Sequence, residues 1–226
     1  MFMDRLHGVL SNIANLAKST EEVERGFAEA ANIILADYRL VAGNTCFQIL
    51  ELEFYFHQTL FHPDPYSHAF QYPNRVQAKM SVTGSWYFHR FIGIEKYTHT
   101  RRGLDLTYGN GERQAYGGIL FRSALRESDQ KIFSGPSNLM KAVLDAASDP
   151  QGVQHLAFNL EEGMAFRVDS VIRMEPREKP LPLDLFKTSR FGLGDKDPLY
   201  RDKEYRFFSD RKVIKKIKDF RYRPTS

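Results

Sequence analysis

Apolar residues recur along the chain at two spacings, and the spacing changes near residue 47. In the first 36 residues they recur every three or four positions, as at Leu6, Leu10 and Ile13, which predicts two helices. The segment Ser19-Thr20-Glu21-Glu22 has the spacing of a capping box, so the second helix is expected to begin there. From Phe47 onward apolar and polar residues alternate, which predicts strands. The expected elements after that point are strands at 47–56, 79–91, 103–108, 117–125 and 164–174, a helix at 136–147 that opens with Pro136, and a short strand in KEYRFF.

A run of helices followed by a run of strands is typical of an α+β protein. A chain of 226 residues is long enough to bury one substantial core. We therefore predict a single domain with a curved, mostly antiparallel sheet. Residues 1–36 would form an N-terminal helical arm, 47–208 the core, and 209–226 a basic C-terminal tail.

The composition excludes two classes of protein. Apolar residues make up 42% of the chain, but no apolar run approaches the roughly 18 residues of a membrane-spanning helix. The first residues, MFMDRLHGVLSNIANL, are interrupted by acidic and polar positions, unlike a signal peptide. The single cysteine, Cys46, excludes a disulfide scaffold and suggests a reducing compartment. We expect a monomer without membrane contact in the cytoplasm, associated with the nucleoid in a bacterium, or in the nucleus of a eukaryote.

Positive charge gathers near the C-terminus. The formal net charge is only +4, yet residues 211–223 carry seven Lys or Arg against one Asp. Such a segment can contact a polyanion such as nucleic acid. The alternative is a solvated terminal helix that docks through Val213, Ile214 and Ile217.

Ionisable residues stand inside strands that are otherwise apolar. Side chains alternate across a strand, so Glu51, Glu53 and Tyr55 of QILELEFYF are expected on one face, continuing Phe47 and Ile49, with leucines and phenylalanines on the other. Asp105 in GLDLT and Arg122 in GILFRSAL are placed in the same way.

A buried charge has to be paired, protonated or used. One explanation is a structural ion pair of Arg122 with Asp105 or Glu51. The other is a functional cleft lined by Glu53, Asp105 and Arg122, because carboxylates beside a cation suit acid–base chemistry.

Two further groups of residues could contribute to such a cleft. The loop after the first strand holds His57, His62, Asp64 and His68, which could be the ligands of a metal ion in a metal-dependent hydrolase. Their spacing matches no familiar zinc pattern. We keep this hydrolase as an alternative and assign no metal or cofactor.

The aromatic strand SWYFHRF is expected to place Trp86 and Phe88 on one face and Tyr87 and His89 on the other. These rings are core residues by default. A ring exposed on the cleft would instead offer a platform on which a planar base stacks.

One family shares several short motifs with this chain in the same order. The segment E-L-E-F-Y, followed by D-P-Y-S-H, resembles the alkyladenine (3-methyladenine) DNA glycosylase family, which has E-T-E-A-Y and then an A-H or S-H pair. The resemblance covers roughly residues 25 to 208. The later matching pieces are SWYFHRF, LDLT, ILFRSAL, SGPSNLMKAVL, SRFGLG and KEYRFF.

The resemblance implies a protein that binds double-stranded DNA, flips a damaged base and hydrolyses its N-glycosidic bond without a cofactor. Glu53 would activate the attacking water, with Arg122 beside it. The residues around the base would be Tyr55, His68, Phe88 or Tyr87, and Asp105. The residues on the DNA backbone would be Arg90, Arg101, Arg102, Lys215 and Lys216.

The chain departs from the family pattern at two places. The wedge tyrosine that the family inserts into the duplex has no clear counterpart, and Asp105 stands where the family has asparagine. Beside the metal-dependent hydrolase, two functions on this fold therefore stay open. The first is a monofunctional glycosylase for alkylated or deaminated purines, and the second is a damaged-DNA or nucleobase-binding protein that does not cleave.

Overall fold

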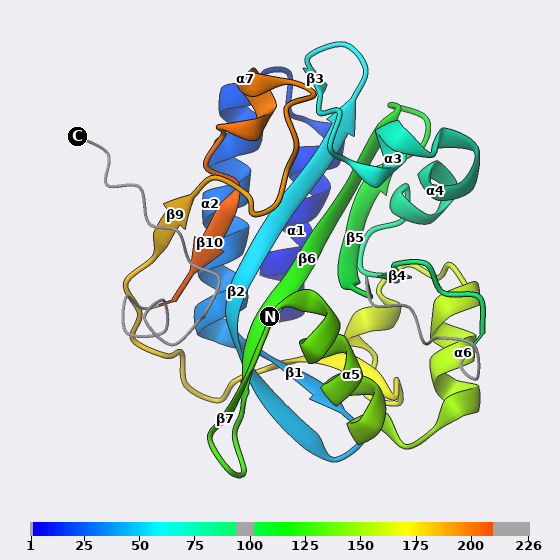
Figure 1. Ribbon diagram of the computed structural model, residues 1–226, viewed down its shortest axis with the longest axis vertical. Coiled ribbons are helices and arrows are strands. Elements are labelled where there is room, and N and C mark those ends of the chain that lie inside the picture. The colour runs from blue at the N-terminus through cyan, green and yellow to red at the C-terminus, as the bar shows by residue number, and fades with distance from the viewer. Residues whose placement is uncertain (1, 94–101, 210–226) are drawn as a thin grey trace.

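A curled, antiparallel ten-stranded sheet with helices on both of its faces organises the molecule (Figure 1). The computed structural model describes residues 2–93 and 102–209. The prediction of a single-domain α+β fold is confirmed. The predictions for Arg101, Lys215, Lys216 and the tail from residue 210 lie outside the described residues. None of the helices in the described part of the chain is both long and apolar enough to cross a bilayer.

The helices and strands have the following bounds along the chain. The helices are α1 (Phe2–Asn15), α2 (Thr20–Asp37), α3 (His68–Gln71), α4 (Pro73–Met80), α5 (Pro136–Ala147), α6 (Pro150–Phe158), the 3-10 helix η1 (Met164–Phe166) and α7 (Pro198–Arg201). The strands are β1 (Tyr38–Ala42), β2 (Thr45–Gln58), β3 (His62–Pro63), β4 (Trp86–Phe88), β5 (Leu104–Asn110), β6 (Ala115–Arg126), β7 (Lys131–Ser134), β8 (Ile172–Pro176), β9 (Phe186–Thr188) and β10 (Arg206–Phe208).

The long strands β2 and β6 pair along most of their length and form the centre of the sheet. The main path runs β4-β5-β6-β2-β1-β8. The other edge of β2 also pairs with β10 and β3, and β9 adds to β10. Segments about 150 residues apart in sequence, β2 and β10, are therefore neighbours in the sheet.

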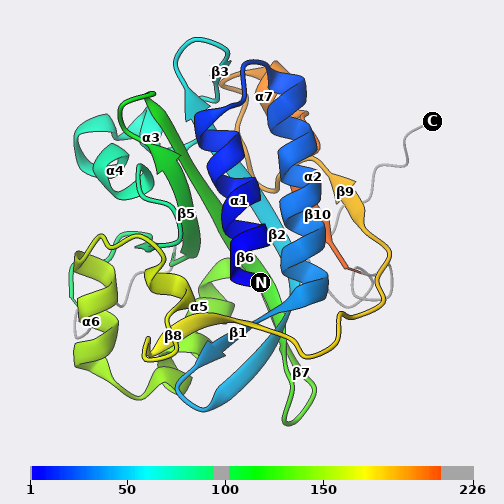
Figure 2. The ribbon, with the colours of Figure 1, turned by 180° about the vertical axis from the view of Figure 1, so that it is seen from behind.

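Helices α1 and α2 cover one face of the sheet (Figure 2), and the main core lies between them and the strands. Ser19 caps α2 by accepting a hydrogen bond from the N–H of Glu22, as the capping-box motif predicts. The apolar stripe of α2 then meets β2, where the rings of Phe27 and Phe54 stack with centroids 4.7 Å apart. Burial of such large rings is a main source of folding free energy.

The opposite face of the sheet carries α3, α4 and α5 (Figure 1). Helix α5 begins at Pro136 and ends at Ala147, as the sequence predicts. Helix α4 packs on β5 and β6, where the carbonyl oxygen of Met80 approaches Gly109 closely. A Cβ at Gly109 would lie 2.1 Å from that oxygen, so only glycine allows this helix so near the strand.

Three expectations for the strands were wrong. Residues 79–91 form the end of α4, an irregular segment that includes Gly84 at φ +75°, and only three residues of strand. Residues 164–171 form η1 and a loop, and strand β8 begins only at Ile172. The register of β2 shifts between Ile49 and Leu52, which places Ile49 in the main core instead of beside Glu51. A bulge of this kind breaks the two-residue alternation on which the prediction was based.

Candidate functional site

Six side chains form a row across the face of the sheet that α1 and α2 do not cover. In antiparallel strands, directly opposed residues point to the same face. The pairing registers therefore align Thr188, Arg206, Glu53, Leu120, Asp105 and Tyr87 across β9, β10, β2, β6, β5 and β4. Glu53 and Asp105 are two strands apart, or about 10 Å between their backbones.

Glu53 is the centre of the first half of the row. Its carboxylate accepts hydrogen bonds from the Tyr55 hydroxyl at 2.8 Å, from Nη1 of Arg122 at 3.1 Å and from the backbone N–H of Phe191 at 2.7 Å. The side chain is 0% exposed. Three donors around one carboxylate hold it in a single orientation.

Glu51 holds Arg122 from the other side. It accepts from Nε of Arg122 at 3.0 Å, from the Ser123 hydroxyl at 2.5 Å and from Nε of Arg206 at 2.5 Å. Burial by itself lowers the pKa of Arg122, but the carboxylates of Glu53 and Glu51 raise that pKa above its usual value. Arg122 is therefore a fixed cation between two glutamates. The ion pair of Arg122 with Glu51, one of the two structural pairs expected from the sequence, is present.

Tyr55 links this group to a second buried ion pair. Asp64 binds Arg190 through both carboxylate oxygens, at 2.6 and 3.1 Å, and both side chains are fully buried. The guanidinium carbon of Arg190 lies 4.5 Å from the ring centroid of Tyr55. Burial, and then the charge of Glu53, raise the pKa of the Tyr55 phenol, so the neutral phenol donates to Glu53. Because Arg190 covers one ring face of Tyr55, the predicted stacking of a base on this residue is restricted to the other face.

Histidines gather at the other half of the row. Nε2 of His89 is 2.7 Å from a carboxylate oxygen of Asp105, and Nδ1 of His68 is 3.2 Å from the Tyr87 hydroxyl. The rings of His68 and His89 have centroids 4.5 Å apart. Burial, and then the neighbouring His89, lower the pKa of His68 to about 4. We call these four residues, His68 of α3, Tyr87 of β4, Asp105 of β5 and the neighbouring His89, the histidine group.

The structure thus brings the predicted residues together in two groups. Glu53, Tyr55 and Arg122 form one, and His68, Tyr87 and Asp105 form the other, with Leu120 between them in the row. Both carboxylates in the row are covered, since Glu53 is 0% and Asp105 is 1% exposed.

Three predicted residues lie outside both groups. The prediction for Phe88 was wrong, because it packs in the core opposite Leu104 and is 3% exposed; Tyr87 occupies the sheet face with the row instead. Arg90 is exposed in the turn after β4. Arg102 is half-buried, and its backbone N–H donates to the Ser137 hydroxyl.

The four residues considered as metal ligands do not converge. His62 bonds the Tyr205 hydroxyl and the carbonyl oxygen of Phe56, and Asp64 binds Arg190. His57 lies parallel to Tyr116, and His68 belongs to the histidine group. Within the described ranges no group of three or more His, Cys, Asp or Glu residues could hold a metal ion.

Sequence reasoning missed Arg190, Phe191 and Arg206. Arg206 carries the same signal as Arg122, since it is a charged residue between aromatic neighbours in a short strand, YRFF. Arg190 and Phe191 lie in the irregular segment SRFGLG, where no periodicity marks a buried side chain. Their contacts with Tyr55 and Glu53 join positions about 135 residues apart, and only the fold reveals them.

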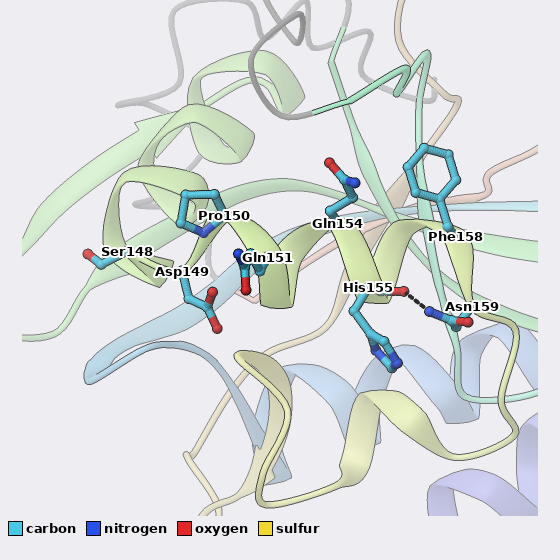
Figure 3. A pocket seen from close by; sticks show the side chains of 8 residues that line it. All are labelled: Ser148, Asp149, Pro150, Gln151, Gln154, His155, Phe158 and Asn159. Atoms are coloured by element: carbon cyan, nitrogen blue, oxygen red, sulfur yellow. Dashed lines mark hydrogen bonds between the residues drawn. The ribbon is translucent and has the colours of Figure 1, made fainter.

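Two hollows on the surface differ in their relation to the row. One of about 940 Å³ runs along α6, and all of its lining residues belong to that helix and its flanks (Figure 3). It therefore shares no residue with the row. The other, of about 560 Å³, contains Thr188 and Arg206 of the row and Phe191, whose N–H binds Glu53. We call this hollow, lined by parts of residues 188–195, 201–202 and 206, the arginine cleft.

Comparisons with known proteins give little guidance on function. No family model matches the chain. The chain is similar to "Uncharacterized protein L759" of Acanthamoeba polyphaga mimivirus, with 26% identity over 209 residues, which cover 85% of this chain and 89% of the viral protein.

Proposed function

We propose that the protein hydrolyses the N-glycosidic bond of a damaged purine nucleotide flipped out of double-stranded DNA. The observation that carries the proposal is the setting of Glu53, a carboxylate that Tyr55 and Arg122 orient on a sheet face. The resemblance of the sequence motifs to the alkyladenine glycosylases points to the same residues.

The chemistry follows from the charges around Glu53. Cleavage of a glycosidic bond develops positive charge on the sugar. A carboxylate below that carbon stabilises the charge and accepts a proton from the attacking water. The hydrogen bonds from Arg122 and Tyr55 would keep the carboxylate in one orientation during the reaction. The base would lie toward Leu120 and Asp105, the next residues of the row.

Access to Glu53 requires movement of one segment. The backbone N–H of Phe191 binds the carboxylate, and the ring of Phe191 lies 5.3 Å from the guanidinium carbon of Arg122. Gly192 follows at φ +72°, and a side chain there would meet open space. In the proposed reaction residues 191–193 move aside and open Glu53 toward the arginine cleft, while Arg190 keeps its ion pair with Asp64.

The complete burial of Glu53 favours a second candidate function. If residues 191–193 stay closed over the carboxylate, the ion pair of Glu53 with Arg122 only stabilises the fold. The protein would then bind damaged DNA or a nucleobase without cleaving it.

The test uses duplexes that carry hypoxanthine or 3-methyladenine, incubated with the protein and then treated with hot alkali. The wild type is expected to break the strand at the lesion. Glu53→Gln should reduce base release by at least about 100-fold, in the range of general acid–base and electrostatic contributions, and should still bind the duplex.

Glu127→Gln is the matched control. Glu127 also binds arginine, with a 2.7 Å contact to Arg177, but it lies in the turn that follows β6 and outside the row. Thermal unfolding of each variant confirms that it is folded. A folded Glu53→Gln protein with wild-type activity would refute the role of Glu53. Binding without strand breaks in the wild type would support the second candidate.

A further inference from the structure

Helices α3 and α4 lie on the sheet without a backbone hydrogen bond to any strand of the described chain (Figure 1). We call residues 68–81, which contain both helices, the α3–α4 segment. Its backbone hydrogen bonds to other described backbone groups end within the segment or at the residue just before it. Two side-chain hydrogen bonds, both of 3.2 Å, join it to other helices or strands of the described chain: His68 to the Tyr87 hydroxyl, and Lys79 to the carbonyl oxygen of Ala157.

The chain is fixed on both sides of this segment. Before it, the Tyr66 hydroxyl donates to the carbonyl oxygen of Gly194 at 2.6 Å and accepts from the N–H of Asp197 at 2.9 Å. After it, the N–H of Gly84 donates to the carbonyl oxygen of Thr107 at 2.8 Å. The segment can therefore move between two anchors while the rest of the chain keeps its place.

The apolar contact beneath the segment is separate from the main core. Ala69, Val76 and Met80 of the segment form a cluster of their own with Tyr87 and Tyr116 of the sheet. None of these residues belongs to the main core between the sheet and helices α1 and α2. Parts of a protein with few buried apolar contacts open locally at a lower free-energy cost than the whole fold.

Two histidines lie in this interface, one on each side. His68 belongs to the segment and reaches Tyr87 of the sheet. His57 belongs to β2 and contacts Phe70 of the segment, with ring centroids 5.2 Å apart, while it lies parallel to Tyr116. Nδ1 of His57 is buried and has no hydrogen-bond partner among the described residues.

The interface holds both imidazoles neutral. Burial, and then His89, lower the pKa of His68 to about 4, and burial lowers the pKa of His57. Asp105 and Asp64 oppose these shifts, but their carboxylates are already paired with His89 and with an arginine. The other titratable or charged groups nearby are Tyr72, Tyr87 and Arg90 at His68, and Tyr116 at His57.

We propose that the α3–α4 segment is an acid-sensitive flap, which swings away from the sheet as a unit while the main core stays packed. Protons favour the open form, because both imidazoles reach water there and become charged. Opening uncovers the Asp105 end of the row. A Cβ at Gly118 would lie 2.7 Å from Oδ2 of Asp105 and 3.1 Å from Cε of Met80, so the end of α4 packs where this carboxylate lies. The proposal does not depend on the proposed function.

The two pKa values of His68 give the size of the response. The pKa of its imidazole is 6.5 in the solvated, open form and about 4 in the closed form. Between pH 7 and pH 5 the ratio of open to closed molecules therefore rises about 20-fold. His57 adds to the rise, because burial lowers its pKa as well.

Native-state hydrogen exchange followed by NMR measures the opening. The protection factor of each amide corrects for the slower intrinsic exchange in acid. Amides of α4 are expected to be less protected than those of α2 and to depend only weakly on urea, since the flap exposes little surface when it opens. From pH 7 to pH 5 the protection of α4 should fall by about 20-fold or more. Equal protection and equal urea dependence in the two helices would overturn the proposal, because α4 would then open only by global unfolding.

Two substitutions test whether the histidines drive the opening. His68→Gln keeps a hydrogen-bonding group near Tyr87, and His57→Phe keeps a ring beside Tyr116 without a polar atom. The double variant should lose the fall in α4 protection, and His155→Gln, at an exposed position of α6, should behave like the wild type. The fluorescence of the buried tryptophan confirms folding. An unchanged fall in the folded double variant, or in His68→Gln alone where the double variant does not fold, would refute the proposal.

Discussion

His68 makes the stability of the fold depend on pH, and His68→Gln tests this. The side chain is largely covered by its neighbours, and burial lowers the pKa of its imidazole from 6.5 to about 4. The groups that face it are His89, Asp105, Arg90 and Tyr87. Below pH 6.5 the unfolded chain takes up a proton that the folded protein refuses. Stability is therefore lost as the pH falls from about 6.5 to about 4, and not further below that value.

The size of the effect follows from the two pKa values. A shift from 6.5 to about 4 corresponds to about 3 kcal/mol when the titration is complete, at 1.36 kcal/mol per unit. Between pH 7 and pH 5, where the imidazole of the unfolded chain becomes almost fully charged, the loss is about 2 kcal/mol. That is a large part of the free energy of unfolding of an ordinary domain.

Urea unfolding at pH 7 and pH 5 measures this loss, and the single tryptophan, Trp86, is a buried fluorescent probe. The wild type should lose about 2 kcal/mol more than His68→Gln between the two pH values, since glutamine keeps a hydrogen-bonding group near Tyr87 but does not titrate. His155→Gln, which removes an exposed imidazole on α6, should behave like the wild type. Equal losses in the wild type and His68→Gln would show that His68 does not stay neutral in the fold.

Two other predictions concern the interior. Asp64→Asn should lower the free energy of unfolding by about 3–5 kcal/mol in urea, because it leaves the buried guanidinium of Arg190 without its carboxylate; a loss below about 1 kcal/mol would mean that other groups compensate this charge. Gly117→Ala should cost about 1–3 kcal/mol in the same assay, because its Cβ would lie 2.4 Å from the buried ring of Tyr108. Gly8→Ala is its control, since its Cβ would meet nothing within 4 Å in α1, and a cost similar to that of Gly117→Ala would contradict the steric explanation.

The residues of the candidate site were predictable where a charge interrupts a regular apolar pattern. Glu53, Asp105 and Arg122 stand in strands, so alternation alone assigns each of them to a face. The same rule failed at Ile49, where the bulge in β2 changes the face. It also gave no choice between Phe88 and Tyr87 as a residue of the site, because both are aromatic and the core can accept either.

The contacts of these residues could not be predicted. Phe191 and Arg190 reach Glu53 and Tyr55 from an irregular segment, and Arg206 reaches Glu51 from β10. Each of these contacts depends on which strands become neighbours, and a single sequence carries no signal for pairing between distant segments.

The sequence by itself determined the class of fold, the two N-terminal helices, the helix that opens at Pro136 and the charged positions of the central strands. These features are local, because capping, proline placement and periodicity act over a few residues. Only the tertiary structure decided that the N–H of Phe191 donates to Glu53 and that Arg122 lies between two glutamates. The contact of His89 with Asp105 was likewise decided by the tertiary structure. The physical reason is that the partner of a buried charge is selected by sheet register and packing, which bring together groups that lie far apart along the chain.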